Sequence, residues 1–290
     1  TVVAIPCSGE SLPRVSIPRN PRIQLVNDSG LDLVGDLHGH AGQLHRLLPK
    51  LGYLEGPSGE AYTHPDGRKA VFVGDFINRG PEVAEVLRVV HAMSEMGSAL
   101  AVLGNHEFSL FTSAFAGKTE PPAECRPHLD WLRGLPLSLE VEGLRVVHAA
   151  WHAPSLEIVA GRTCEDEEFV RLAATKGTPE HKAASILVKG IKVPLPLDKV
   201  YRDRFGIPRT KGRIRWWLDP TGVSYADLLF PPCVGTPEDI GPTNIELEDV
   251  VPYASDEPPV FLGHYCLLPS VPKINGNVAC VDGCVTCDGI

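Results

Sequence analysis

The sequence predicts an α/β fold in which a mostly parallel sheet carries a functional site at one edge. The prediction depends on three apolar runs, each of which has the length of a buried strand and leads into polar residues. The runs are LDLVGD at residues 31–36, AVFVGD at 70–75 and LAVLG at 100–104. Strand, crossover helix and strand in succession imply parallel strands with right-handed connections.

The segments between these strands have the apolar spacing of amphipathic helices. Leucines recur at helical intervals over residues 41–51. Pro81 suits the first turn of a helix, because its missing N–H is not needed there, and the apolar face that follows continues to about Gly97. Further helices are predicted from 107, at 129–135, 165–175 and 179–188, and further strands at 139–141, 144–147, 260–263 and 278–282.

The chain is expected to form one domain preceded by an extended arm. Residues 1–29 contain four prolines and little periodicity, which predicts an N-terminal arm, and residues 30–290 would form the domain. Within the domain, residues 199–215 are strongly basic, whereas residues 216–272 contain no Lys or Arg. We expect an irregular acidic, proline-rich loop or lid at about 216–258, although such long loops are uncommon in compact domains.

The overall composition is that of a soluble globular protein. The 290 residues are 43% hydrophobic and 22% charged, which is enough to bury a sizeable core. The net charge of -9 argues against a general nucleic-acid binder, but a metal ion could still attract an anionic substrate. We find no apolar run near the ~18 residues of a membrane span and no secretory signal pattern. A cytoplasmic protein that binds neither nucleic acid nor membranes is therefore expected.

The cysteines predict reduced thiols better than a disulfide framework. The chain has eight cysteines, most of them isolated in apolar or mixed surroundings. Cys284 and Cys287 form a single CxxC pair without a second pair at zinc-finger spacing. We expect them to be two incidental thiols on a terminal strand or tail.

The polar residues at the strand ends are those that bind divalent metals such as Mn, Fe or Zn. Asp36 and His38 are two residues apart, so on an extended backbone they would point to the same face. Asp75 offers two oxygens, which is enough to bridge two ions, and Arg79 offers a guanidinium fork for phosphate oxygens. Two ions ~3.5–4 Å apart can clamp a phosphoryl group and activate a water for attack. The remaining candidate ligands are Asn105, His148 and His264.

Five short motifs resemble those of the calcineurin-like metallophosphoesterases, in the phosphoprotein phosphatase branch. They are DLHGH at 36–40, GDFINRG at 74–80, GNHE at 104–107, VVHAA at 146–150 and GHY at 263–265. They occur in family order over nearly the whole chain, which chance rarely produces. The resemblance is to bacterial serine/threonine phosphatases and symmetrical dinucleoside-tetraphosphatases, and it implies a sandwich of two mixed β-sheets flanked by helices.

The resemblance also implies the metal ligands. The first ion would be held by Asp36, His38 and Asp75. The second would be held by Asp75, Asn105, His148 and His264. Manganese is the expected metal at both positions, with iron or zinc as the alternatives.

By the same resemblance, Arg79 would bind the substrate phosphate together with Asn105, and His106 would protonate the leaving oxygen. Glu107 is expected to anchor its loop and not to touch a metal. The family has a second phosphate-binding arginine whose motif is not clear in this chain. The candidates for it are Arg209, Arg213 and Arg215.

Asn78 departs from the pattern, because the family usually has Asp at this position of GDxxDRG. That Asp pairs with the histidine of GNHE and stabilises its charged form. An amide can accept a hydrogen bond from the ring but carries no charge. Protonation of the leaving group by His106 is therefore in question.

We predict a dinuclear-metal phosphatase that hydrolyses phosphomonoesters through a metal-activated water. Its substrate would be a phosphorylated protein, a small phosphoester or a nucleotide. The alternative enzyme is a symmetrical dinucleoside polyphosphate hydrolase. A catalytically weakened phosphate-binding protein is the alternative of another class, because Asn78 replaces the usual Asp.

Overall fold

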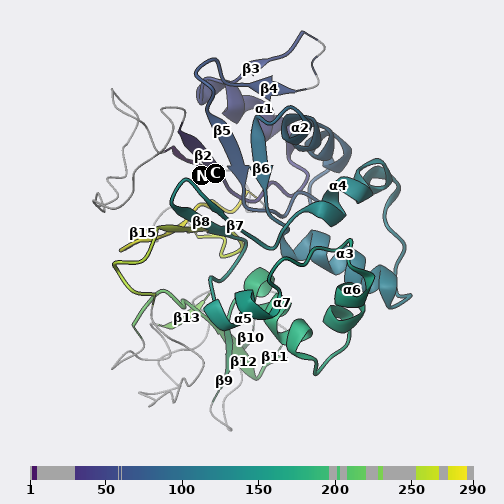
Figure 1. The fold of residues 1–290 in the computed structure, drawn as a ribbon, viewed down its shortest axis with the longest axis vertical. Helices are drawn as coiled ribbons and strands as arrows, with labels where there is room; N and C mark the ends of the chain where they lie inside the picture. Colours follow the sequence, from purple (N-terminus) through teal and green to yellow (C-terminus); the bar gives the residue numbers. More distant parts are fainter. Residues whose placement is uncertain are drawn as a thin grey trace.

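The computed structural model confirms the α/β fold and contains two mixed β-sheets that share a hydrophobic core (Figure 1). The structure describes residues 2–4, 30–57, 59, 61–195, 201–202, 208–219, 228–230, 253–267 and 274–285. Among the described helices, none combines the length and the apolar character needed to cross a bilayer.

The first sheet has the strand order β1–β2–β5–β6. Its strands are β1 (Val2–Ala4), β2 (Leu31–Val34), β5 (Lys69–Phe72) and β6 (Ala99–Ala101). As predicted, β2, β5 and β6 are parallel, whereas β1 runs antiparallel to β2. Thus three residues of the predicted N-terminal arm join the sheet, and residues 5–29 lie outside the described residues.

The second sheet has the order β15–β16–β14–β8–β7. Its three inner strands are parallel and its two edge strands are antiparallel. The strands are β7 (Ser138–Val141), β8 (Leu144–Val147), β14 (Val260–Leu262), β15 (Ile274–Asn275) and β16 (Val278–Cys280).

Apolar side chains from both sheets form the core between them. Leu33, Val71 and Val102 on the first sheet's side join one buried cluster with Val146 and Phe261 of the second. Alternate residues of the same strands are buried in a larger cluster that includes the helices. Because the central strands are buried on both faces, they appear in the sequence as continuous apolar runs.

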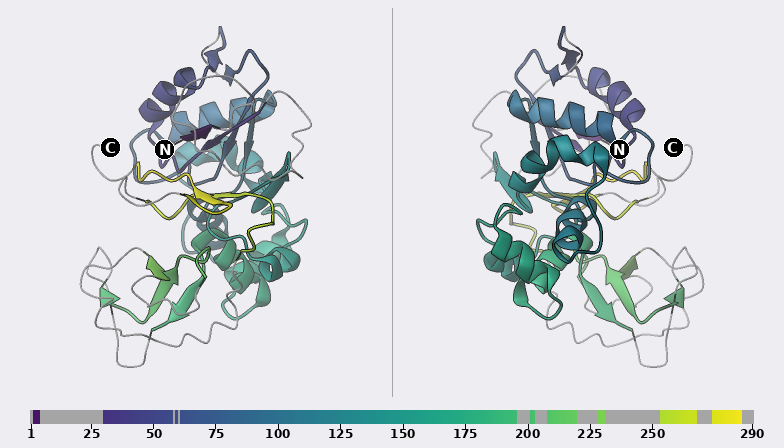
Figure 2. Two further views of the ribbon diagram at one scale, coloured as in Figure 1. Left: turned by 90° about the vertical axis from the view of Figure 1, so that its left-hand side faces the viewer. Right: turned by 90° about the vertical axis from the view of Figure 1, so that its right-hand side faces the viewer.

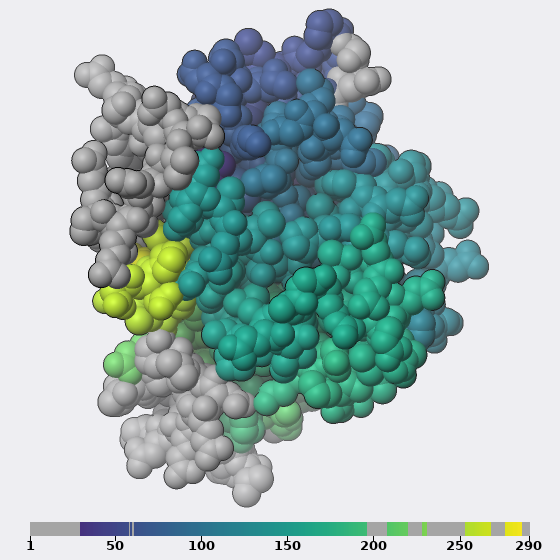
Figure 3. All heavy atoms as spheres, in the orientation of Figure 1, coloured from purple at the N-terminus to yellow at the C-terminus, as the bar shows by residue number. Residues whose placement is uncertain are grey.

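The predicted helices are present within a few residues of the expected bounds. Their amphipathic faces lie in the larger core cluster. Helices α1 and α2 lie at one end of the molecule, and α5 to α7 form the teal and green lower right of the face seen in Figure 3. The helices are α1 (Ala41–Lys50), α2 (Val83–Glu95), α3 (Asn105–Phe115), α4 (Leu129–Gly134), α5 (Ala153–Ile158), α6 (Glu167–Ala174), α7 (Pro179–Lys189) and a 3₁₀ helix (Ala123–His128).

A third sheet, of order β13–β12–β9, lies at the end of the molecule opposite α1 and α2 (Figure 2). It consists of β9 (Lys192–Pro194), β12 (Lys211–Ile214) and β13 (Leu229–Phe230). Two hairpins are formed by β3 (Leu54–Glu55) with β4 (Tyr62–Thr63), and by β10 (Tyr201–Arg202) with β11 (Pro208–Arg209).

The prediction of an irregular loop at about 216–258 is wrong at residues 229–230, whereas the described residues 216–219 and 253–258 contain no helix or strand. Leu229 and Phe230 form β13, whose backbone pairs with Ile214 and Arg213. Trp216 is also buried, and its indole N–H donates to the carbonyl of Ala149. The lid is predicted from the absence of Lys and Arg and the abundance of acidic residues and proline. This pattern does not show whether the apolar residues between them are buried. The remainder, 220–227 and 231–252, lies outside the described residues.

Candidate active site

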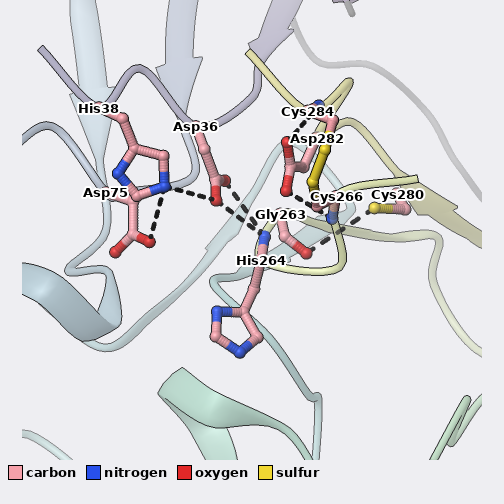
Figure 4. Close-up of a disulfide and its surroundings, with 9 residues drawn as sticks. All are labelled: Asp36, His38, Asp75, Gly263, His264, Cys266, Cys280, Asp282 and Cys284. Carbon is pink, nitrogen blue, oxygen red and sulfur yellow. Dashed lines mark hydrogen bonds and ion pairs between the residues drawn. A yellow bond between two sulfur atoms is a disulfide. The ribbon is translucent and has the colours of Figure 1, made fainter. Parts of the chain in front are cut away.

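The predicted metal ligands converge on Asp75, in the loop after β5. Nε2 of His38 lies 3.5 Å from one carboxylate oxygen of Asp75, and Nε2 of His148 lies 3.4 Å from the other. Figure 4 shows His38, Asp36 and Asp75 close together and His264 approaching from a different segment of the chain. The candidate ligand atoms form two groups, each within 4.8 Å: His38, Asp75 and His106, and Asp75, His148 and His264.

The other two predicted ligands lie beside these groups. Asp36 Oδ2 is 3.9 Å from His38 Nε2, and Asn105 Oδ1 is 3.2 Å from His148 Nε2. The expectation that strand alternation aligns Asp36 with His38 is wrong, because β2 ends at Val34 and His38 has a φ of 43°. A turn brings the two side chains together instead.

Two of the histidines are oriented by carbonyl oxygens. His38 Nδ1 lies 3.3 Å from the carbonyl oxygen of Ile77, and His148 Nδ1 lies 2.7 Å from that of Val73. Donation of Nδ1–H to these oxygens leaves each Nε2 free to bind a metal, which is the usual arrangement around ligating histidines. Nε2 of His264 is buried without a hydrogen-bond partner among the described residues. These observations fit a site for divalent metals.

The charges of the site lead to the same conclusion. Burial, followed by the charge of Asp282, raises the pKa of Asp36 well above its usual value. Burial opposes ionisation of Asp75, but His148, His106 and His38 outweigh it and lower the pKa of Asp75. Burial would lower the pKa of His148, yet Asp75 and Asp36 raise it to about 10. The negative charge of these buried carboxylates favours protonation of the buried imidazole. The same charge would stabilise a bound cation at this place.

Most of the left-handed backbone conformations at non-glycine residues fall on site residues. Positive φ costs energy in any residue with a Cβ, so such residues persist only where the surrounding structure holds them, often at functional sites. In the described chain eight non-glycine residues have positive φ, and five of them are predicted site residues. Those five are His38, Asp75, Asn78, Arg79 and His264.

Glu107 holds the loop that carries Asp75. Its carboxylate accepts N–H bonds from Asp75 at 3.0 Å, Phe76 at 2.8 Å, Ile77 at 3.1 Å and Gly104 at 3.0 Å. The side chain is fully buried, and burial together with the charge of Asp75 raises its pKa to about 7. The expected anchoring role of Glu107 is confirmed.

The predicted catalytic residues lie at the same loops. Asn78 Nδ2 is 2.7 Å from His106 Nδ1, so the amide donates to this nitrogen and the ring's own proton is on Nε2. Burial lowers the pKa of His106, Asp75 opposes this, and the charge of Arg79 lowers the pKa further. The charge of Arg79 also contributes to the lowered pKa of His38.

Among the three candidate arginines, Arg213 is linked to the site. Its guanidinium lies over the ring of Tyr265, 5.5 Å from the ring centre, and Tyr265 follows His264. Burial, and then the charge of Arg213, lowers the pKa of His264. Arg209 is exposed on β11, and Arg215 donates its backbone N–H to the carbonyl of Leu228.

Sequence reasoning missed Asp282, which follows β16 and is buried. Its carboxylate accepts the N–H of Cys266 at 2.6 Å and that of Cys284 at 2.8 Å, as Figure 4 shows. Asp282 therefore joins the turn after His264 to the turn after β16. The run VACVD at 278–282 ends in an acid just as LDLVGD does, and this was the available signal.

The expectation of reduced, unpaired cysteines is wrong for Cys266 and Cys284, which form a disulfide (Figure 4). The two residues are 18 positions apart and lie in turns that tertiary structure brings together. Cys125, Cys164 and Cys280 are buried free thiols. Cys287 lies outside the described residues.

The fold and the Asp75 cluster are those of a metal-dependent phosphoesterase. The family model of the calcineurin-like phosphoesterases matches residues 31–189, more than half of the chain. The chain belongs to this family, whose members are hydrolases of phosphoric esters that use divalent metals.

Named relatives match parts of the chain. It is 43% identical over 89 residues to the asymmetrical bis(5'-nucleosyl)-tetraphosphatase PrpE of Halalkalibacterium halodurans, a match covering 31% of this chain and 35% of the relative. It is 34% identical over 126 residues to the symmetrical bis(5'-nucleosyl)-tetraphosphatase of Ralstonia nicotianae, covering 40% of each. The chain thus spans about a third of the length of the first of these relatives.

A solved structure is also similar. The cold-active protein-tyrosine phosphatase of a psychrophilic Shewanella species has a TM-score of 0.46 and 15% identity. The comparison covers 88% of this chain and 71% of that chain.

Glu107→Gln should destabilise the protein strongly. The amide keeps one acceptor oxygen but presents an NH₂ group to two of the four buried N–H donors. Two unsatisfied buried donors cost about 2–6 kcal/mol of unfolding free energy. Urea unfolding checks this against Glu157→Gln, an exposed position of α5, which should change stability by less than about 0.5 kcal/mol. A Glu107→Gln protein as stable as the control would contradict the anchoring role.

Reduction of the Cys266–Cys284 disulfide should lower the stability by about 3 kcal/mol, because it removes an 18-residue cross-link from the unfolded chain. The measurement is urea unfolding with and without a phosphine reductant. A Cys266→Ser/Cys284→Ser protein is the control, and its stability should not respond to the reductant. If the intact mass of the untreated protein shows all cysteines reduced, this pairing is excluded.

Proposed function

We propose that this chain is a phosphatase that holds two divalent metal ions and hydrolyses phosphomonoesters. The observation that carries the proposal is the pair of ligand groups that share Asp75. Asp36, His38 and Asp75 lie around one position, with His106 beside them as the proton donor, and Asp75, Asn105, His148 and His264 lie around the other. Manganese at both positions, with iron or zinc as alternatives, is part of the proposal.

Bound metal ions would supply positive charge to polarise the phosphate and to make a water nucleophilic at neutral pH. The protein's own groups then bind and orient the substrate. The charge of Arg79 acts on both His38 and His106, and its guanidinium would hold two phosphate oxygens. With Asn78 donating to Nδ1, the proton of His106 would be on Nε2, which lies 3.9 Å from Asp75 Oδ2 beside the ligand cluster.

The leaving-group step depends on Asn78. With the amide donating to Nδ1, His106 can offer the Nε2 proton only from a neutral ring, which is a weak acid. An alkoxide leaving group needs that proton, whereas an aryl oxide leaves without it. We therefore propose that aryl phosphates are hydrolysed in preference to alkyl phosphates.

A second candidate is a dinucleoside polyphosphate hydrolase, which the names of the two relatives above favour. Comparing a phosphopeptide with a dinucleoside tetraphosphate as substrates of the metal-reconstituted protein distinguishes the two activities. Absence of turnover with retained metals would favour a phosphate-binding protein. The cytoplasmic location and the phosphoprotein substrate expected from the sequence stay predictions.

Asp75→Asn should remove more metal and more activity than Asn105→Ala, because Asp75 is the residue that both ligand groups share. We expect a loss in kcat/KM above the ~10–100-fold that is typical of residues supporting a metal ligand. The experiment measures bound metal by mass spectrometry and turnover of p-nitrophenyl phosphate on the same samples. Full occupancy by two metals in Asp75→Asn would show that Asp75 is not the bridge.

Asn78→Asp should accelerate alkyl phosphates about tenfold or more, since general acid catalysis contributes at most ~10²–10⁴-fold and part of it is restored. Aryl phosphates should change by less than about twofold, since their leaving group needs no proton. The measurement is kcat/KM for one alkyl and one aryl phosphate, with Asn78→Ala as the control that lacks the hydrogen bond. Equal changes for both substrates would mean that Asn78 does not limit His106.

A further inference from the structure

The disulfide between Cys266 and Cys284 lies beside a candidate metal ligand. Cys266 is half-buried, two residues after His264, and Cys284 is buried in the turn after β16. The bridge thus joins the segment that follows β14 to the segment that follows β16, and these strands are parallel neighbours in the second sheet. Figure 4 shows His264 and Cys266 on one short turn.

The backbone of this turn is hydrogen-bonded to two other candidate ligands. The N–H of His264 donates to the carboxylate of Asp36, at 3.1 Å from Oδ2 and 3.2 Å from Oδ1. The N–H of Gly263 donates to the backbone carbonyl of His148 at 2.9 Å. A displacement of the turn would therefore move the imidazole of His264 relative to the other residues of the second ligand group.

On the other side of His264, the turn is held by the segment to which the disulfide links it. The carboxylate of Asp282 accepts the N–H of Cys266 at 2.6 Å and that of Cys284 at 2.8 Å. The backbone carbonyl of Asp282 accepts the N–H of Leu267 at 3.2 Å. The disulfide and these hydrogen bonds therefore hold the same two segments together.

The linked segments keep a left-handed backbone at three residues that have a Cβ. The φ angle is 63° at His264, 40° at Cys266 and 64° at Cys284. This conformation costs energy and persists only where the surrounding structure holds it. When the covalent link between the two cysteines is absent, the hydrogen bonds alone must hold His264 in its position.

Exposure favours Cys266 as the point where an external thiol reaches the bridge. Cys266 is half-buried, whereas Cys284 and the nearby free thiol of Cys280 are buried. The S–H of Cys280 donates to the carbonyl of Gly263 at 3.7 Å, so this thiol also packs against the turn. In the cytoplasmic location expected from the sequence, disulfides are usually transient or redox-sensing, which favours a switch over a permanent cross-link.

We propose that the Cys266–Cys284 disulfide is a redox switch for metal binding. In the oxidised protein the bridged turn holds His264 in the second ligand group, and reduction releases the turn and weakens binding at that position. The inference rests on the two-metal site proposed above. The first position should respond less, because its other ligands, His38 and Asp75, lie outside the linked segments.

The reductant is a low-molecular-weight thiol. Its thiolate attacks Sγ of Cys266, the S–S bond breaks, and Cys284 leaves as a thiolate that takes up a proton. A second thiolate then attacks the sulfur of the reductant in the mixed disulfide, and Cys266 leaves and takes up a proton. The protein gains two electrons and two protons, and the two thiols become one disulfide.

Metal binding that depends on the intact bridge must also protect the bridge from reduction, because coupling between two equilibria is reciprocal. The test equilibrates the protein with reduced and oxidised glutathione, with and without saturating Mn²⁺. Alkylation and mass spectrometry measure the fraction of bridged protein. Mn²⁺ should raise the value of [GSH]²/[GSSG] at the midpoint about tenfold or more, at the low end of the ~10–100-fold effect of groups that support a metal ligand.

His264→Ala is the matched variant, because it removes the imidazole and keeps both cysteines. In this variant Mn²⁺ should shift the midpoint by less than about twofold, since the bridge acts through the missing side chain. Shifts of equal size in the two proteins would mean that reduction only loosens the fold, and they would overturn the proposal. A bridge that stays oxidised at every glutathione ratio would also overturn it.

Calorimetry of Mn²⁺ binding to the oxidised protein distinguishes failure of the switch from failure of the proposed function. Two Mn²⁺ sites without a midpoint shift overturn the switch alone. Fewer than two sites count against the two-metal function.

Hydrogen exchange of the metal-free protein tests the turn without metal or turnover. The N–H groups of His264 and Cys266 donate to Asp36 and Asp282, so a peptide that contains them should exchange faster after reduction. Peptides of α2 are the control and should not change. Unchanged exchange at the turn would overturn the proposal whatever the metal content.

Discussion

The buried carboxylate of Glu107 is the interaction on which the site geometry depends. Its two oxygens accept hydrogen bonds from backbone N–H groups of the loop after β5 and of Gly104, just before α3. These bonds, together with the N–H of His106 that donates to Asp75 Oδ1, fix the backbone of Asp75 relative to Asn105 and His106. The loop can therefore hold left-handed residues that would otherwise be costly.

Asp75 gives the site its symmetry. One oxygen faces His38 and the other faces His148, and these histidines come from different sheets. Each ring is fixed from behind by a backbone carbonyl, Ile77 for His38 and Val73 for His148. The position of both ligand groups is therefore determined by how the two sheets pack.

Three buried carboxylates lie beside the candidate metal ligands. Asp36, Asp75 and Asp282 are buried where the two large sheets meet, and their negative charge favours a cation there. Asp282 and the Cys266–Cys284 disulfide fix the turn that carries His264.

The sequence by itself determined the parallel strands, most helices and the residues that gather at Asp75, because hydrophobic periodicity and short motifs are local properties. Predictions from the sequence failed where a structural feature depends on contacts between distant segments. Those contacts formed β13 within a predicted loop, paired Cys266 with Cys284 and gave Asp282 its role. Only packing decides which strand edges, thiols and charges meet, since none of these pairings leaves a periodic pattern in the chain.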